Sequence, residues 1–204
     1  MGLTGRLRLR NPESSQRSVF AVISLWGRVD KPNGEPDLRF DLLKILLVDD
    51  NHHMRVLLTE ILRAIGVRHV FEATDGAEAL NLMRSQPIDI IMSDLAMQPM
   101  DGIEFVRLLR NSPDSPNPMA PVILITGHST MKRVNEARDV GVNEFLSKPV
   151  TAKGVLERLN RVVESARPFV RTQNYFGPDR RRRNDPNYDG PKRRATDGIP
   201  PKKS

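Results

Sequence analysis

Residues 88–94 read IDIIMSD. An apolar run of this length, closed by a carboxylate, is typical of a buried strand in a parallel sheet. Such a strand carries Asp94 at its C-terminal end, which is the edge where open parallel sheets bind their ligands. This short stretch therefore predicts a sheet and the position of a functional acid.

Three further apolar runs lead to polar residues in the same way. The runs and the polar residues that follow them are 44–48 with Asp49 and Asp50, 121–125 with Thr126, and 142–146 with Lys148. Because the C-terminal ends of parallel strands meet at one crevice, three acids, a hydroxyl and an ammonium group are expected to converge. Crowded carboxylates need a cation, and oxygen ligands with room for water suit Mg²⁺.

Strand-like and helix-like segments alternate along the chain. The pattern predicts strands at 44–48, 67–72, 88–93, 121–126 and 142–146, and helices at about 52–65, 76–84, 102–110, 130–140 and 151–166. Five strand–helix units of this kind predict an α/β fold, a doubly wound parallel sheet with helices on both faces.

The order of these anchors resembles the receiver domain of two-component response regulators, of the stand-alone type found in chemotaxis. The resemblance runs from about Lys44 to Ala166 and includes the step Lys148-Pro149. It implies the flavodoxin-like strand order 2-1-3-4-5, Mg²⁺ as the cofactor, and a cis peptide bond before Pro149. It also implies a phosphoryl-accepting switch rather than an enzyme.

The resemblance further assigns the metal and acceptor residues. Asp94 would accept a phosphoryl group from a histidine kinase or a histidine phosphotransfer protein. Asp50 and Asp94 would bind Mg²⁺ directly, Asp49 would hold it mainly through water, and the backbone carbonyl of Ala96 would be a further ligand. A carboxylate needs no general base to attack phosphorus, provided that charge on the equatorial oxygens is neutralised.

The resemblance also implies a switch. Thr126 would bond the phosphoryl oxygens, Lys148 would pair with them, and Phe145 would be the switch aromatic residue. Ala96 and His128 occupy positions that tune hydrolysis of the phosphoryl group in this family. The chain has Gln98 where the family usually has proline, which predicts a slightly different loop path.

The net charge is concentrated at the C-terminus. Residues 167–204 contain eleven Lys and Arg and four Asp, so their net charge equals the +7 of the whole chain. We expect three parts: a mostly disordered extension at 1–41, a receiver domain at 42–166, and a disordered basic tail at 167–204 that is rich in Pro, Gly and Arg. The tail repeats a Gly-Pro-x-Arg-Arg element at 177–181 and 190–194.

Composition and length restrict the alternatives. The chain has no cysteine and no apolar run of the roughly 18 residues that span a membrane, so we expect a cytoplasmic protein. The tail has no core for an output domain. It is expected either to be a solubilising, disordered basic extension or to bind an acidic partner or nucleic acid, in addition to an unknown downstream protein. A dehalogenase-like phosphatase is disfavoured, because its second acid would stand where this chain has Ala96.

Overall fold

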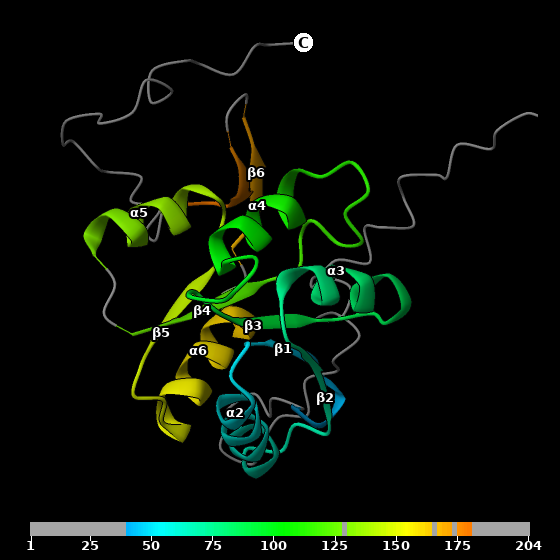
Figure 1. Ribbon diagram of the computed structural model, residues 1–204, viewed down its shortest axis with the longest axis vertical. Helices are drawn as coiled ribbons and strands as arrows, with labels where there is room; N and C mark the ends of the chain where they lie inside the picture. Colours follow the sequence, from blue (N-terminus) through cyan, green and yellow to red (C-terminus); the bar gives the residue numbers. More distant parts are fainter. Residues whose placement is uncertain (1–39, 128–129, 165–166, 173–174, 181–204) are drawn as a thin grey trace, which may run out of the picture.

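The computed structural model describes residues 40–127, 130–164, 167–172 and 175–180 (Figure 1). A short 3-10 helix, η2 (Phe40–Leu42), leads into the first strand. The central sheet contains β1 (Lys44–Val48), β2 (His69–Ala73), β3 (Ile90–Asp94), β4 (Val122–Thr126) and β5 (Glu144–Ser147). The helices are α2 (His52–Ala64), α3 (Gly76–Ser85), α4 (Gly102–Asn111), α5 (Met131–Asp139) and α6 (Ala152–Glu164).

The sheet has five parallel strands in the order β2-β1-β3-β4-β5. This confirms the predicted α/β fold and the order 2-1-3-4-5. The element boundaries differ from those expected by at most two residues, mainly where an apolar residue lies in a loop beside a strand. Val67, for example, is buried just before β2 begins.

Helices cover both faces of the sheet, as Figure 1 shows: α3, α4 and α5 lie on one side and α2 and α6 on the other. Each face has its own apolar layer, because side chains alternate between the faces along every strand. Leu46 and Leu124 belong to the layer under α3, α4 and α5, whereas Leu47 and Ile125 belong to the layer under α2 and α6. Strands β3 and β4 are buried along their whole length.

The chain continues beyond α6 into an antiparallel hairpin of β6 (Phe169–Arg171) and β7 (Phe176–Pro178). The prediction of a disordered tail is therefore wrong for residues 167–172 and 175–180. Strands of three residues are too short to show a period, and their stability comes from packing on α4 and on the start of β5. The repeat at 190–194 lies outside the described residues.

Candidate functional site

The strand register brings the predicted residues to one edge of the sheet. Asp94 ends β3 and pairs with Ile125, the residue before Thr126 at the end of β4. Thr126 pairs with Ser147, and the amide of Lys148 donates to the carbonyl of Thr126 at 2.7 Å. The convergence that the apolar runs predicted is confirmed for Asp94, Thr126 and Lys148.

Asp94 and Lys148 form an ion pair at this edge. Lys148 Nζ lies 2.7 Å from Asp94 Oδ1, and the amide of Ala96 donates to Asp94 Oδ2 at 3.0 Å. The carboxylate is 5% exposed, so solvent screens the pair weakly. A buried carboxylate oriented by an ammonium group and an amide is suited to meet an electrophile that arrives from the open side of the site.

Asp49 is the most deeply buried of the three acids, at 1% exposure. Its Oδ1 accepts the amide of Asn51 at 2.8 Å, whereas its Oδ2 is buried with no hydrogen-bond partner among the described residues. Burial raises the pKa of the Asp49 carboxyl, the amide of Asn51 acts in the opposite direction, and the charge of Asp94 raises it again. A buried oxygen with no donor nearby fits a site that receives a cation or its water.

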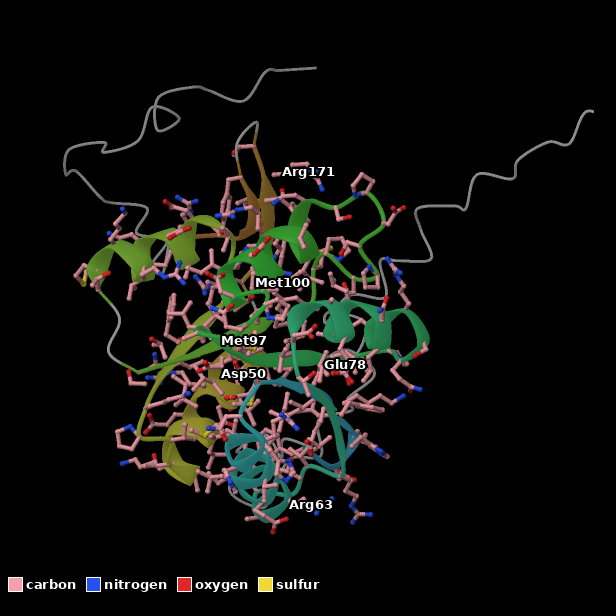
Figure 2. All side chains as sticks on the ribbon, viewed as in Figure 1. Asp50, Arg63, Glu78, Met97, Met100 and Arg171 are labelled. Atoms are coloured by element: carbon pink, nitrogen blue, oxygen red, sulfur yellow. The ribbon has the colours of Figure 1, made fainter. Side chains whose placement is uncertain are left out.

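Asp50 is exposed and reaches the loop that follows β3. The amide of Gln98 donates to Asp50 Oδ2 at 3.2 Å, and the Gln98-Pro99 peptide bond is cis. Figure 2 shows Asp50 and Met97 in the same part of the molecule, at the edge where β3 ends. In the loop at Gln98, where a different path was expected, the backbone amide thus contacts Asp50 of the acid pair. The Lys148-Pro149 bond is cis as well, which confirms that prediction.

Arg55 was not among the predicted site residues. Its Nη1 donates to the carbonyl of Asp49 at 2.8 Å, and its Nε forms an ion pair with Glu72 at 3.0 Å. The guanidinium therefore holds the main chain just before Asp50. The signal in the sequence is weak: an arginine four residues after Asn51, on the first turn of a helix, is usually a solvent-exposed residue.

Gly102 lets α4 approach the acceptor closely. A Cβ atom at this position would lie 2.3 Å from the carbonyl oxygen of Asp94, so no larger residue fits without a shift of the backbone. Asp101 caps the same helix by accepting the amide of Glu104 and forms an ion pair with Arg133 of α5 at 2.9 Å. Burial raises the pKa of Asp101, but the bonds from Glu104 and Arg133 lower it to below its ordinary value.

The donor set fits Mg²⁺. Over residues 40–127, 130–164, 167–172 and 175–180, no three acidic or histidine side chains gather as a preformed metal cage. Mg²⁺ takes one or two carboxylates and retains several waters. Asp50 offers an exposed carboxylate and Asp94 a buried one, while the unpaired Oδ2 of Asp49 can accept a bond from a metal-bound water.

The remaining predicted residues lie as follows. Ala96 is exposed beside the acceptor, and the orientation of its carbonyl toward a metal stays a prediction. Phe145 is half-buried in β5 and packs against the apolar layer under α5. His128 lies outside the described residues.

The model of the response regulator receiver domain family matches residues 45–160. Chemotaxis protein CheY-3 of Vibrio cholerae is 34% identical over 122 residues, which are 60% of this chain and 92% of that protein. Chemotaxis protein CheY of Pseudomonas aeruginosa is also 34% identical over 122 residues and is covered to 97%.

Solved structures give the same result. The structure of Vibrio cholerae chemotaxis protein CheY4 shares 32% identity with a TM-score of 0.55, and the match covers 59% of this chain and 98% of that one. The receiver domain of the sensor histidine kinase PA1611 from Pseudomonas aeruginosa, solved with a magnesium ion in its active-site cleft, shares 26% identity with a TM-score of 0.54. That match covers 60% of this chain and 98% of the other.

Proposed function

Since this chain belongs to the response regulator receiver family, we propose that Asp94 is the residue that receives its phosphoryl group. The family works as a phosphoaspartate signalling switch with Mg²⁺ and not as a catalytic enzyme. The ion pair of Asp94 with Lys148, at 2.7 Å, is the observation that supports the assignment most strongly. This ion pair orients Asp94, which is the acid at this edge of the sheet that belongs to a fully buried central strand, β3.

The proposed transfer needs little from the protein beyond position and charge. A carboxylate oxygen of Asp94 forms the bond to phosphorus while the bond from phosphorus to the donor histidine nitrogen breaks, and that nitrogen keeps the electron pair. Lys148 and the hydroxyl of Thr126 bind the phosphoryl oxygens. Bound Mg²⁺ supplies positive charge there; Asp50, Asp94 and the Ala96 carbonyl would hold it, with Asp49 acting through water.

The partners follow from the same chemistry. A receiver domain implies a histidine kinase as its donor, and we propose that this donor is the kinase itself or a histidine phosphotransfer protein. Leu124 and Phe145 are opposite each other in the register, so Thr126, two residues along, lies on the same face of the sheet as the Phe145 ring. We propose that Thr126 moves toward the phosphoryl group and that Phe145 turns inward, which changes the face of α5, β5 and α6 that a downstream protein reads.

The chain has two proposed flanking parts around the receiver unit at 42–166, namely 1–41 and 167–204. The +7 charge of residues 167–204 supports a role as a tether to an acidic partner or nucleic acid, through contacts that weaken as salt is raised. Of the helices that the structure describes, none combines the length and the apolar character of a bilayer span. We place the protein in the cytoplasm, where ATP supplies the phosphohistidine donors.

Acetyl phosphate with Mg²⁺ tests the acceptor. We expect one hydroxylamine-sensitive phosphate per chain, mapped to Asp94, and no labelling of the Asp94→Asn variant. Asp50→Ala should lose Mg²⁺ binding by calorimetry, because it removes a direct carboxylate ligand from a site that has few. Asp114→Ala, in the exposed loop before β4, is the matched control and should behave as wild type. Wild-type labelling of Asp94→Asn would refute the assignment.

A further inference from the structure

The C-terminal hairpin fits against the connection between α5 and β5 with its backbone in direct contact. Gly141, in that connection, and Gly177, in β7, face each other so closely that a Cβ atom on Gly177 would lie 2.7 Å from the Cα of Gly141. A Cβ on Gly141 would in turn lie 2.9 Å from the carbonyl oxygen of Phe176. Two glycines are therefore required for this fit, which makes the hairpin a specific part of the fold.

Arg110, near the end of α4, is the charge that the hairpin covers. The side chain is 2% exposed, and its guanidinium donates to the carbonyls of Gly141 and Pro118 and lies 5.0 Å from the centroid of the Phe169 ring of β6. Burial lowers the pKa of Arg110 to about 9. Docking the hairpin thus takes the Arg110 guanidinium out of water, and no carboxylate of the described residues forms an ion pair with it. This cost opposes the free energy gained by burying Gly177, Pro178 and part of Phe169.

Two arginines of the hairpin segment attach it to the elements of the switch. Arg180 forms an ion pair with Asp139 at the end of α5, at 2.9 Å. Arg167 donates to the carbonyl of Asn143 and lies 3.8 Å from Glu144, the first residue of β5. Figure 1 shows the hairpin beside α4 and α5, and Figure 2 shows Arg171 of β6 far from Asp50. The hairpin therefore lies near the N-terminal end of β5, whereas the acids lie at the C-terminal ends of the strands.

A groove between the hairpin and β5 contains Phe145 in its wall. Tyr175 and Pro178 of the hairpin segment line the same groove, as does Asn143. The hydroxyl of Tyr175 donates to the carbonyl of Pro178 at 2.6 Å, and the guanidinium of Arg180 lies 4.0 Å from the centroid of the Tyr175 ring, so this side of the groove is well ordered by its own contacts. A change in the position of the Phe145 ring would alter the wall of the groove that the hairpin faces.

Strand β5 connects this groove to the phosphoryl site. Arg167 donates to the carbonyl of Asn143 just before the strand, Phe145 within the strand lines the groove, and the strand leads directly to Lys148, the partner of Asp94. The span from Asn143 to Lys148 is about 17 Å at the rise of an extended strand. Arg158 of α6 donates to the carbonyl of Phe145 at 2.7 Å and holds the main chain there, so the ring is the part of residue 145 that can move.

We propose that the α5–β5 face is a docking surface for the chain's own hairpin, at residues 167–172 and 175–180, and that phosphorylation of Asp94 weakens this docking. The proposal rests on the proposed function, because it needs Phe145 to turn inward when Asp94 is phosphorylated. The inward turn withdraws one wall of the groove, and the buried charge of Arg110 favours separation. Release exposes the α5–β5 face to a partner and detaches the basic segment that begins after Arg180.

The coupling is reciprocal, as thermodynamic linkage requires. If phosphorylation weakens docking, then a variant that cannot dock must bind a phosphoryl mimic more tightly. Beryllofluoride with Mg²⁺ is such a mimic, and its affinity can be measured without any turnover. Coupling between two sites typically changes an affinity by about fivefold or more.

The first measurement is amide hydrogen exchange of the full wild-type chain. The amides of Thr172 and Asp179 are reporters, because they donate within the hairpin segment to the carbonyls of Tyr175 and Pro168, each at 2.8 Å. Saturation with beryllofluoride should lower their protection, while amides in the central strands β1 and β3 keep theirs. Protection that stays equal or rises would overturn the proposal.

The second measurement compares beryllofluoride affinity among variants. Gly177→Ala, which introduces the clash with Gly141, should bind about fivefold more tightly than wild type. Gly66→Ala is the control: the same substitution, far from the hairpin, at a glycine with no atom within 4 Å of an added Cβ. Equal affinity in Gly177→Ala and wild type, with wild type still labelled by acetyl phosphate, would overturn the coupling alone. Failure of wild type to take up either reagent would overturn the proposed function as well.

Discussion

Lys148 Nζ lies 2.7 Å from Asp94 Oδ1, although β3 and β5, the strands that lead to these two residues, are not neighbours. Asp94 ends β3 and Lys148 follows β5, so the lysine side chain reaches across the end of β4. The pair neutralises a buried acid and places an ammonium group at the site where we propose that the phosphoryl oxygens bind.

Substitution of Lys148 should therefore slow phosphorylation more than it weakens metal binding. We expect Lys148→Ala to reduce the rate of labelling by acetyl phosphate about 100-fold, the usual effect of removing one group that stabilises developing charge. Mg²⁺ affinity, measured by calorimetry, should fall little, because the lysine is no ligand. Lys153→Ala, an exposed residue early in α6, is the control. A labelling rate equal to wild type would contradict the role of Lys148.

Asp49 should show a conflict between stability and metal binding. Its pKa is raised by burial, so the ionised form destabilises the fold. The unfolded carboxyl ionises first as the pH rises, hence wild-type stability falls between the unfolded pKa of 3.8 and the higher folded value. Asp49→Asn should be more stable than wild type at pH 7 by about 1 kcal/mol, a common size for one substitution.

Urea denaturation without Mg²⁺ measures this difference, and the gain should vanish near pH 3, where the wild-type carboxyl is protonated in both states. The same variant should bind Mg²⁺ more weakly by calorimetry. An Asp49→Asn protein less stable than wild type at pH 7 would show that the carboxylate is stabilised by contacts other than those described.

Ala96 should set a long lifetime for the phosphorylated state. Its amide contacts Asp94 Oδ2 at 3.0 Å, so a side chain at this position begins beside the phosphoryl group, yet a methyl group cannot orient a water. Ala96→Asn should shorten the lifetime of the phosphorylated state several-fold, because the side-chain amide of asparagine can hold a water near phosphorus. The decay of labelled protein measures it, with Ala77→Asn on the exposed face of α3 as control. An unchanged decay would refute this explanation.

Gly141 and Gly66 form a matched pair for the stability of the hairpin contact. Both have a positive φ, 95° and 101°, so alanine at either should cost about 1–2 kcal/mol in backbone strain. An added Cβ at Gly66 meets nothing within 4 Å, whereas at Gly141 it meets the carbonyl of Phe176. Urea denaturation should therefore show a larger loss for Gly141→Ala. Equal losses would mean that the hairpin contributes no stability through this contact.

The strands and site residues that could be predicted share one property: each is indicated by a pattern of neighbouring residues in the sequence. The apolar runs before Asp49, Asp94, Thr126 and Lys148 gave the strands and their functional ends, because a buried parallel strand needs continuous apolar residues. The Lys148-Pro149 cis bond followed from the family resemblance in the same residues. The contact of the Gln98 amide with Asp50 could not be predicted, since a backbone amide has no signature in the sequence.

The hairpin of β6 and β7 could not be predicted from a pattern of neighbouring residues. Phe169, Val170 and Phe176 are apolar, but strands of three residues are too short to show a period, and the sequence suggested a disordered tail. Arg110 is equally misleading, because arginine near the end of an exposed amphipathic helix is normally solvated. It is buried because Phe169 covers it and because carbonyls from two distant connections converge on its guanidinium.

The amino-acid sequence by itself determined the five-stranded sheet and the residues at its active edge, because strand periodicity and strand ends are properties of neighbouring residues. The tertiary structure decided what covers the opposite edge: the close approach of Gly141 to Gly177, the burial of Arg110, and the groove that Phe145 shares with Tyr175. Most of these contacts join residues 30 or more positions apart, so their free energy exists only when the sheet has formed and has brought the segments together.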